Sequence, residues 1–398
     1  MTAGKVVTFY SYRGGVGRTM ALANVAWILA SNGRKVLVVD WNLDSPGLHK
    51  YFHPFLGQAK ITATPGVIDL VNDFCWAATR PEGHIGAWQR RYAHVQRDAI
   101  SLNWAAFPEG GTLDFLSAGR QNRDYSAAVA SIDWDNFYER LGGGQFFDAL
   151  RANMKEHYDY TLVDSRTGLS DSADICTVHL PDTVVDCFTL SSQSIEGAAA
   201  VARNVGEGNR LRKIRVLPVP MRVDGAESGM LETGRAVARA KFARFPAGLT
   251  AADAARYWRL VEIPYRPFYT YEEIPAVFGD PPGGKTSLLA AFEQLTSVIT
   301  EGEVSRLPVL PEEVRLRCMN SYIRRQEPPS GGFGLGRVPE EPPGPYPAAR
   351  PGRPAEMTPA VAGLAGTANV QVTGRDQSQT VNNGILFQLD EIYLPVSP

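Results

Sequence analysis

The residues best suited to chemistry form a run of glycines, cations and a hydroxyl near the N-terminus, Arg13-Gly-Gly-Val-Gly-Arg-Thr19. An apolar, β-branched run at residues 5–10 precedes it, and apolar residues at helical spacing follow it, which predicts a turn between a buried strand and a helix. Because Gly14, Gly15 and Gly17 carry no side chains, successive backbone N–H groups can converge on phosphate oxygens beside the helix N-terminus. We therefore expect a phosphate site in this loop.

This loop departs from the usual phosphate-loop pattern GxxxxGK[ST]. The first glycine of that pattern falls on Tyr12, and its lysine falls on Arg18. Arginine keeps the positive charge, but its planar guanidinium is larger than a lysine ammonium and is not equivalent to it in a tight cradle. The position of the loop between a strand and a helix still predicts phosphate binding, and the hydroxyl of Thr19 should supply an oxygen to magnesium.

Two further segments place carboxylates where apolar strands end. In an open α/β sheet, ligands bind at the carboxyl ends of the strands. Asp40 could orient a water molecule or accept a proton there, whereas Asn42 cannot act as a base. Asp44 either compensates for Asn42 or is a solvated or helix-capping loop acid. Asp164, four residues before Gly168, should hold magnesium through water.

Taken together, these segments resemble the MinD/ParA family of P-loop ATPases, whose phosphate loop reads Lys-Gly-Gly-Val-Gly-Lys-Thr. Both lysines are arginine in this chain. The resemblance implies that Arg13 crosses into the partner subunit of an ATP-bound dimer and acts in catalysis like an arginine finger. It implies that Arg18 binds phosphate in its own subunit, and that Asp40 and Asp44 act in catalysis from the switch I segment.

The resemblance also implies a site for ATP and Mg²⁺, in which the N–H of Gly168 bonds the γ-phosphate. Segments at 218–224 and 263–266 would surround the adenine, but the asparagine that usually reads the base is absent before Arg222. Arg166 would be a second cation near the phosphates or part of a surface salt bridge. The expected nucleotide contacts are Gly14, Gly15, Val16, Gly17, Arg18, Thr19, Met20, Gly168, Arg222 and Pro264, and the expected metal ligands are Thr19 and Asp164.

Alternating apolar strands and helical segments predict an α/β fold with a doubly wound, mainly parallel sheet and flanking helices. We expect a P-loop domain at 1–305 and a short helical extension at 306–327. The expected strands lie at 5–10, 35–40, 112–116, 160–164, 184–190, 214–219 and 260–263, and the expected helices start at Thr19 or lie at 287–300 and 315–325.

An aromatic-rich stretch interrupts this alternation at about residues 51–111 and predicts an inserted helical region. Aromatic side chains at such spacing usually serve packing, so one interpretation is a satellite core on the sheet. The other interpretation is a surface that binds a protein partner.

The C-terminal part changes composition sharply. Half of the positions in 328–359 are proline or glycine, which predicts a flexible linker that cannot build a core. Residues 360–398 alternate apolar and polar residues around glycine and asparagine turns, which predicts a β-prone interaction tail. Its Asn- and Gln-containing segments are similar to short amyloid-signalling motifs. The alternatives are a terminal hairpin on the ATPase domain or a disordered end.

The overall composition is that of a globular protein. The chain has 398 residues, of which 44% are hydrophobic and 21% charged, and this excludes global disorder, collagen and coiled coil. A net charge of -2 does not support nucleic-acid binding as the main function. The sequence shows neither a bilayer-spanning apolar run nor a signal peptide, so we expect a cytoplasmic protein without a membrane anchor. Four scattered cysteines indicate neither a zinc site nor disulfides.

These expectations favour one function and leave a second open. The first is an ATP-driven switch, a slow Mg²⁺-dependent ATPase that forms a homodimer around ATP and recruits a protein partner through the aromatic insertion or the C-terminal tail. The second is a hydrolysis-deficient, nucleotide-gated signalling scaffold, such as one of a bacterial defence system, with an amyloid-like C-terminal motif.

Overall fold

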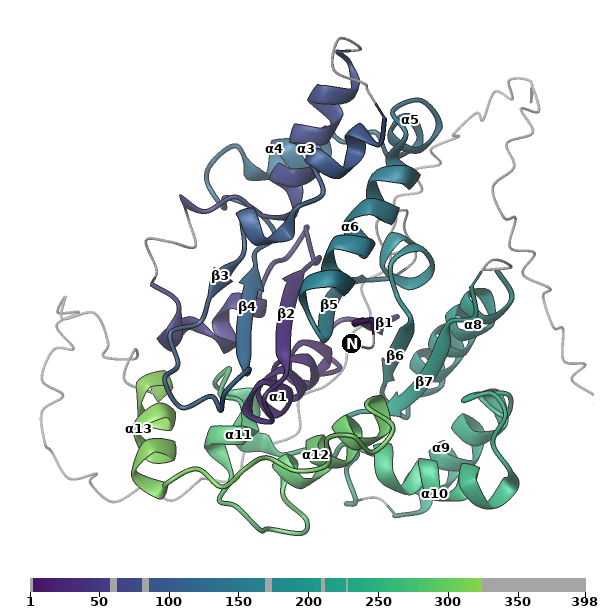
Figure 1. Cartoon of the computed structure of the whole chain (residues 1–398). Coiled ribbons are helices and arrows are strands. Elements are labelled where there is room, and N and C mark those ends of the chain that lie inside the picture. The colour runs from purple at the N-terminus through teal and green to yellow at the C-terminus, as the bar shows by residue number, and fades with distance from the viewer. Residues whose placement is uncertain are drawn as a thin grey trace, which may run out of the picture. The chain divides into compact units, whose positions relative to one another are not determined.

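The computed structural model describes residues 3–57, 63–80, 86–168, 174–208, 212–226 and 228–323 (Figure 1). The predicted linker at 328–359 and the predicted tail at 360–398 lie outside the described residues, so the hypotheses about them stay predictions. Among the described residues, no helix is both long and apolar enough to cross a membrane.

A seven-stranded sheet forms the centre of the described fold, in the order β3-β4-β2-β5-β1-β6-β7. Neighbouring strands are parallel except for the short pair of β3 with β4. The strands are β1 (Lys5–Ser11), β2 (Lys35–Asp40), β3 (Ile100–Ser101), β4 (Thr112–Leu116), β5 (Tyr160–Thr167), β6 (Thr183–Phe188) and β7 (Arg215–Pro220). The expected doubly wound, mainly parallel sheet is therefore confirmed.

Helices cover both faces of this sheet. The helices are α1 (Arg18–Ser31), α3 (Val67–Ala78), α4 (Tyr125–Ala130), α5 (Trp134–Glu139), α6 (Gly143–His157), α8 (Ser192–Gly208), α9 (Ser228–Lys241), α10 (Ala251–Val261), α11 (Ala276–Gly279), α12 (Leu288–Ile299) and α13 (Glu312–Ile323). Shorter helical turns are η1 (Leu48–Tyr51), η2 (His53–Phe55), η4 (Trp88–Arg91), η5 (Val95–Arg97), η6 (Ile175–His179) and η7 (Pro267–Thr270). Helix α13 lies within the stretch expected at 306–327, and the domain boundaries themselves stay a prediction.

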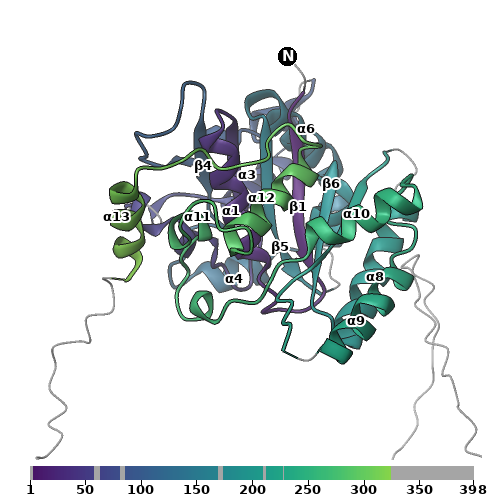
Figure 2. The ribbon, with the colours of Figure 1, turned by 90° about the horizontal axis from the view of Figure 1, so that it is seen from below.

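The two hydrophobic layers follow the alternation of side chains along the central strands. Val36 and Val38 of β2 pack in the layer that contains α1 and α12, whereas Leu37 and Val39 pack in the layer that contains α3 and α6. Figure 2 shows α1, α11 and α12 in front of the sheet when the molecule is seen from below. Both faces of β2 are thus buried, as a central parallel strand requires.

One expected strand is wrong. Residues 260–263 do not pair as a strand, because 260 and 261 are the last turn of α10. The hydroxyl of Thr250 caps that helix by accepting from the N–H of Asp253, and Tyr257, Trp258 and Val261 bury one helical face. A short, mainly apolar run fits a helix end and a strand equally well, so periodicity did not separate them. The N–H of Ile263 donates to the carbonyl oxygen of Pro220 at the end of β7, and an isolated bridge joins Val223 with Pro264.

The aromatic-rich stretch serves mainly as core. Phe52 and Phe74 are fully buried, and Phe74 stacks on Trp88 with 5.1 Å between ring centroids. Trp104 packs edge-on against Trp27 of α1 at 5.6 Å. These contacts support the packing interpretation for most of the region. Trp76 differs, because it is 62% exposed and stacks only against the guanidinium of Arg80 among the ring contacts of the described residues.

Candidate functional site

A cavity of about 850 Å³ lies at the carboxyl ends of β1, β2 and β5, where open α/β sheets bind ligands. Its lining joins the loop before α1 to the end of β5, to the loops after β2 and β7 and to the segment around η7. The lining includes the expected site residues Gly14, Gly15, Val16, Gly17, Arg18, Thr19, Met20, Asp44, Arg222 and Pro264. Arg13, Asp40, Asp164 and Gly168 do not line it.

The glycine loop has the open backbone that a phosphate cradle needs. Gly15 and Gly17 adopt left-handed conformations with φ of 76° and 95°, which favour glycine. A Cβ placed on Gly14 or Gly15 would meet no atom within 4 Å, so the backbone there borders open space. Gly17 ends the loop as the N-cap of α1, whose first N–H groups need an external acceptor. An anion at this place would accept from the loop and from the helix N-terminus.

The side chain of Arg18 is not directed at that loop. Its Nε donates to Oδ1 of Asp164 at 2.6 Å, and its Nη1 approaches Oγ of Ser11 at 3.5 Å. The Arg18 side chain is 5% exposed and that of Asp164 is 1% exposed. The hydroxyl of Thr19 donates to the other carboxylate oxygen of Asp164 at 2.8 Å. Both oxygens of Asp164 therefore accept hydrogen bonds from the first two residues of α1.

The donor chemistry of Thr19 and Asp164 fits magnesium. A hydroxyl oxygen and a carboxylate oxygen are hard ligands of the kind that Mg²⁺ prefers, usually together with waters and substrate phosphates. In the described structure these two groups bond each other, and the positive charge beside the carboxylate comes from Arg18. The two expected metal ligands are thus adjacent.

Asp40 ends β2 and is fully buried. Its carboxylate accepts backbone N–H groups of Asn42 and Leu48, each at 3.2 Å. Burial and the neighbouring charge of Asp164 raise the pKa of Asp40 to about 8, although the two backbone hydrogen bonds oppose this shift. The side chain fixes the path of the loop after β2, because it bonds both ends of it.

The remaining expected catalytic residues lie at the surface. Nε of Arg166 forms an ion pair with Oδ2 of Asp44 at 2.7 Å, and the two side chains are 40% and 48% exposed. This pair joins the loop after β2 to the end of β5. Arg13 is exposed and donates to Oε1 of Gln193 on α8 at 2.7 Å.

Gly168 follows β5 and adopts a left-handed conformation with φ of 77°. Its carbonyl oxygen accepts a hydrogen bond from the hydroxyl of Tyr10 at 3.1 Å. Gly168 does not line the cavity, although the preceding residue, Thr167, does.

Arg222 connects the loop after β7 with the glycine loop. Its Nη1 donates to the carbonyl oxygen of Gly15 at 2.8 Å, and its guanidinium lies 4.9 Å from the centre of the Tyr265 ring. The backbone of Arg222 has a positive φ of 54°, which is uncommon for a residue with a side chain. The isolated bridge of Val223 with Pro264 holds the two segments side by side. Arg222, Tyr265 and Pro264 therefore form one wall of the cavity.

Sequence reasoning missed a further group of cavity residues. Lys50 and Tyr51 of η1 and Tyr269, Thr270 and Glu273 around η7 line the cavity. Nζ of Lys50 forms an ion pair with Oε1 of Glu273 at 3.6 Å. Burial raises the pKa of Tyr51. The only signal in the sequence is a polar and aromatic run that follows the 263–266 segment, and that run contains no phosphate-binding pattern.

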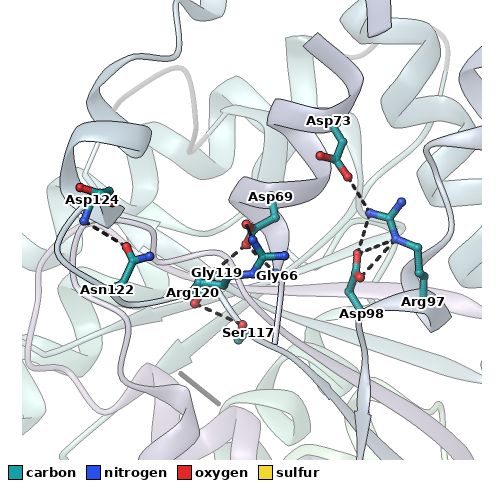
Figure 3. A network of polar contacts seen from close by, with 10 residues as sticks. All are labelled: Gly66, Asp69, Asp73, Arg97, Asp98, Ser117, Gly119, Arg120, Asn122 and Asp124. Carbon is teal, nitrogen blue, oxygen red and sulfur yellow. Dashed lines mark hydrogen bonds and ion pairs between the residues drawn. The ribbon is translucent and has the colours of Figure 1, made fainter. Parts of the chain in front are cut away.

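A smaller cavity of about 510 Å³ shares Asp44 and Arg166 with the first. Residues of the loop after β4, including Asn122, contribute to its lining. Asp69 of α3 holds that loop, because its Oδ2 accepts the N–H groups of Gly66 at 2.9 Å and of Arg120 at 3.3 Å (Figure 3). The Asp44 and Arg166 pair is thus the common wall of both cavities.

No protein-family model matches the sequence, and no curated protein matches it significantly. Solved structures do match. The apo form of McdA from Cyanothece is 15% identical with a TM-score of 0.51, and the match covers 74% of this chain and 99% of that one. An McdA variant from Cyanothece in complex with ATP is 14% identical with a TM-score of 0.52, covering 78% and 100%. The cell-division ATPase MinD from Pyrococcus furiosus is 18% identical with a TM-score of 0.47, covering 75% and 99%.

The McdA structures match this chain over almost their whole length, so the similarity concerns the complete fold and not one motif. Because the sequence identity is low, the similarity establishes the fold alone. The chain has the fold of the MinD/ParA-like P-loop ATPases.

Proposed function

We propose that the chain is a nucleotide-dependent switch that binds ATP with Mg²⁺, pairs with a second copy around the nucleotide and in that state recruits a protein partner. The observation that carries this proposal is the open glycine loop between β1 and α1. It borders a cavity of about 850 Å³ at the carboxyl ends of the strands. A cavity of this size holds a small-molecule ligand.

Two further observations support a nucleotide as the ligand. The cavity extends from the glycine loop to a wall of Arg222 and Tyr265, which supplies planar groups on which a base can stack. The structurally similar McdA variant is a complex with ATP. Thr19 and Asp164 would hold Mg²⁺, which would neutralise phosphate charge when bound.

Arg13 supports the pairing step. Its guanidinium is exposed beside the glycine loop and does not line the cavity of its own subunit, so it is free to act on a second copy. Its hydrogen bond to Gln193 keeps it at the surface between β1 and α8. An exposed hydrogen bond of this kind is weak and easily exchanged.

A second candidate, a nucleotide-gated scaffold that hydrolyses ATP very slowly or not at all, is favoured by the state of Asp40. A residue that orients the attacking water must reach the reacting phosphate. Asp40 is fully buried and does not line the cavity, and its carboxylate already accepts two backbone N–H groups. In such a scaffold, ATP binding drives the pairing of two copies, and ATP hydrolysis serves at most to separate them again.

Light scattering of the purified full chain tests the switch. We expect Mg²⁺ with ATP to double the mass, and Mg²⁺ with ADP or no nucleotide to leave the monomer. Arg13→Ala should bind ATP but remain monomeric. Arg239→Ala is the matched control, because Arg239 is exposed on α9 and does not line the cavity, and this variant should still double its mass.

Two results would contradict the proposal. A chain that binds no nucleotide, or whose mass is the same under all three conditions, is not an ATP-dependent switch. If ATP doubles the mass, the release of inorganic phosphate then separates the slow ATPase from the gated scaffold.

A further inference from the structure

The contacts of Arg18 do not match the phosphate-binding role expected for its position in the sequence. Its guanidinium donates to Asp164 on β5 and approaches Ser11 on β1, both of which belong to the sheet and not to the glycine loop. With 5% of the side chain exposed, the cation is enclosed by these partners. In this state it neutralises a carboxylate and does not present its charge to a ligand.

The same carboxylate is the one that suits magnesium. Oδ1 of Asp164 is occupied by Arg18 at 2.6 Å, and Oδ2 is occupied by the hydroxyl of Thr19 at 2.8 Å. A divalent cation at Asp164 would have to displace at least one of these donors. It would also lie next to a buried guanidinium, where repulsion between like charges is poorly screened.

From this arrangement we infer that Arg18 competes with Mg²⁺ for Asp164. The guanidinium of Arg18 is then released to bind the nucleotide only when Mg²⁺ takes its place at this carboxylate. This inference rests on the proposed nucleotide function. Metal binding and the release of Arg18 are then one coupled event, because both use the same carboxylate.

Other cations can hold a nucleotide before Arg18 is released. Lys50, Arg166, Arg222 and Arg266 line the cavity without contacting Asp164. Nucleotide binding without metal should therefore be measurable in the natural chain, and added Mg²⁺ should strengthen it only weakly, since the metal must first displace a buried ion pair.

The arginine side chain suits this role better than the lysine of the common loop pattern. Its planar fork can donate to Asp164 through Nε while Nη1 points to Ser11, whereas an ammonium is a point charge with no fixed second direction. Arg18→Lys should therefore weaken the competition without abolishing the charge.

The test is the ratio of two dissociation constants for a fluorescent ADP analogue, measured with the full chain in EDTA and in excess Mg²⁺. For the natural chain we expect the two constants to agree within about threefold. In Arg18→Met, which keeps the length of the stem and removes the charge, Asp164 is free for the metal, and Mg²⁺ should strengthen binding about tenfold more than in the natural chain. Arg18→Lys should give an intermediate ratio.

Arg266→Met is the matched control, because it removes a cation from the same cavity without touching Asp164. It should weaken binding equally in both conditions and leave the ratio unchanged. Arg18→Lys keeps the charged pair and serves as the second variant in case Arg18→Met does not fold.

The outcomes separate this inference from the proposed function. If Arg18→Met weakens binding equally with and without Mg²⁺, then Arg18 is a simple phosphate ligand and the competition is overturned. The same holds if neither Arg18→Met nor Arg18→Lys gains more affinity from Mg²⁺ than the natural chain. A natural chain that binds no nucleotide in either condition overturns the proposed function and the competition together.

Discussion

Two buried aspartates lie on either side of β1 and have opposite surroundings. Asp164 of β5 is paired in register with Phe9, and Asp186 of β6 is paired with the next residue, Tyr10. Asp164 accepts from Arg18 and Thr19. Asp186 is also fully buried, but neither of its carboxyl oxygens has a hydrogen-bond partner among the described residues.

The difference follows from the side-chain direction in a strand. The side chains of successive residues of β1, such as Phe9 and Tyr10, point to opposite faces of the sheet. The carboxyl groups of their register partners, Asp164 and Asp186, therefore also lie on opposite faces. The face of Asp164 meets the first turn of α1, which supplies a cation and a hydroxyl. Among the residues that the structure describes, the face of Asp186 supplies Asp186 with neither. The comparison shows that the start of α1, and not depth in the sheet, gives a buried carboxylate its hydrogen-bond partners.

The largest effect is expected when the paired aspartate is removed. Asp164→Ala leaves the guanidinium of Arg18 buried without its counter-ion, and loss of one partner of a buried pair typically lowers the free energy of unfolding by about 3–5 kcal/mol. Urea denaturation of the nucleotide-free chain measures this loss. The double variant Arg18→Met with Asp164→Leu should recover most of it, because no buried charge is left. A loss below about 1 kcal/mol in Asp164→Ala would show that the pair is not buried in solution.

The opposite sign is expected for the unpaired aspartate. Asp186→Val replaces a buried polar group that lacks partners by a β-branched apolar one suited to a strand, and should raise the free energy of unfolding by about 1–3 kcal/mol at neutral pH. The measurement is again urea denaturation. A decrease would show that Asp186 has a stabilising contact.

The pH dependence is the control for that interpretation. Burial raises the pKa of Asp186 well above its ordinary value, so the folded chain keeps a proton that the unfolded chain loses above about pH 4. The contribution of Asp186 to stability is therefore complete below that pH and is lost as the pH rises toward the pKa in the folded state. Between pH 5 and 8, roughly the range of typical maximum stability, Asp186→Asn should show a smaller decline of stability than the natural chain. Parallel declines would contradict the raised pKa.

Local sequence patterns could predict most of the fold and the loop at the centre of the site. Apolar runs gave β1, β2 and β4, and the glycines between β1 and α1 indicated the phosphate cradle. The patterns failed at 260–263, where Leu260 and Val261 end a helix. Short apolar runs do not distinguish the two structures.

The partners of the site residues could not be predicted, because they come from distant parts of the chain. Arg18 and Asp164 are 146 positions apart, and their pairing depends on β5 lying beside β1. Lys50 meets Glu273 only because η1 and the segment after η7 border one cavity. The sequence neighbours of Arg18 therefore predict a phosphate-binding side chain, whereas the partner of Arg18 is set by the order of the strands.

The smallest effect is expected for a second ion pair, which joins the loop after β2 to the end of β5 at the surface. Asp44 and Arg166 approach within 2.7 Å, almost as closely as Arg18 and Asp164, but their side chains are 48% and 40% exposed instead of 1–5%. Water already solvates both charges, so a double-mutant cycle of Asp44→Asn and Arg166→Met should give a coupling free energy of only about 0.2–1 kcal/mol. The coupling should decrease further in 1 M salt, where the screening length is about 3 Å. A coupling as large as that of the buried pair would mean that contact distance, and not burial, sets the strength of these pairs.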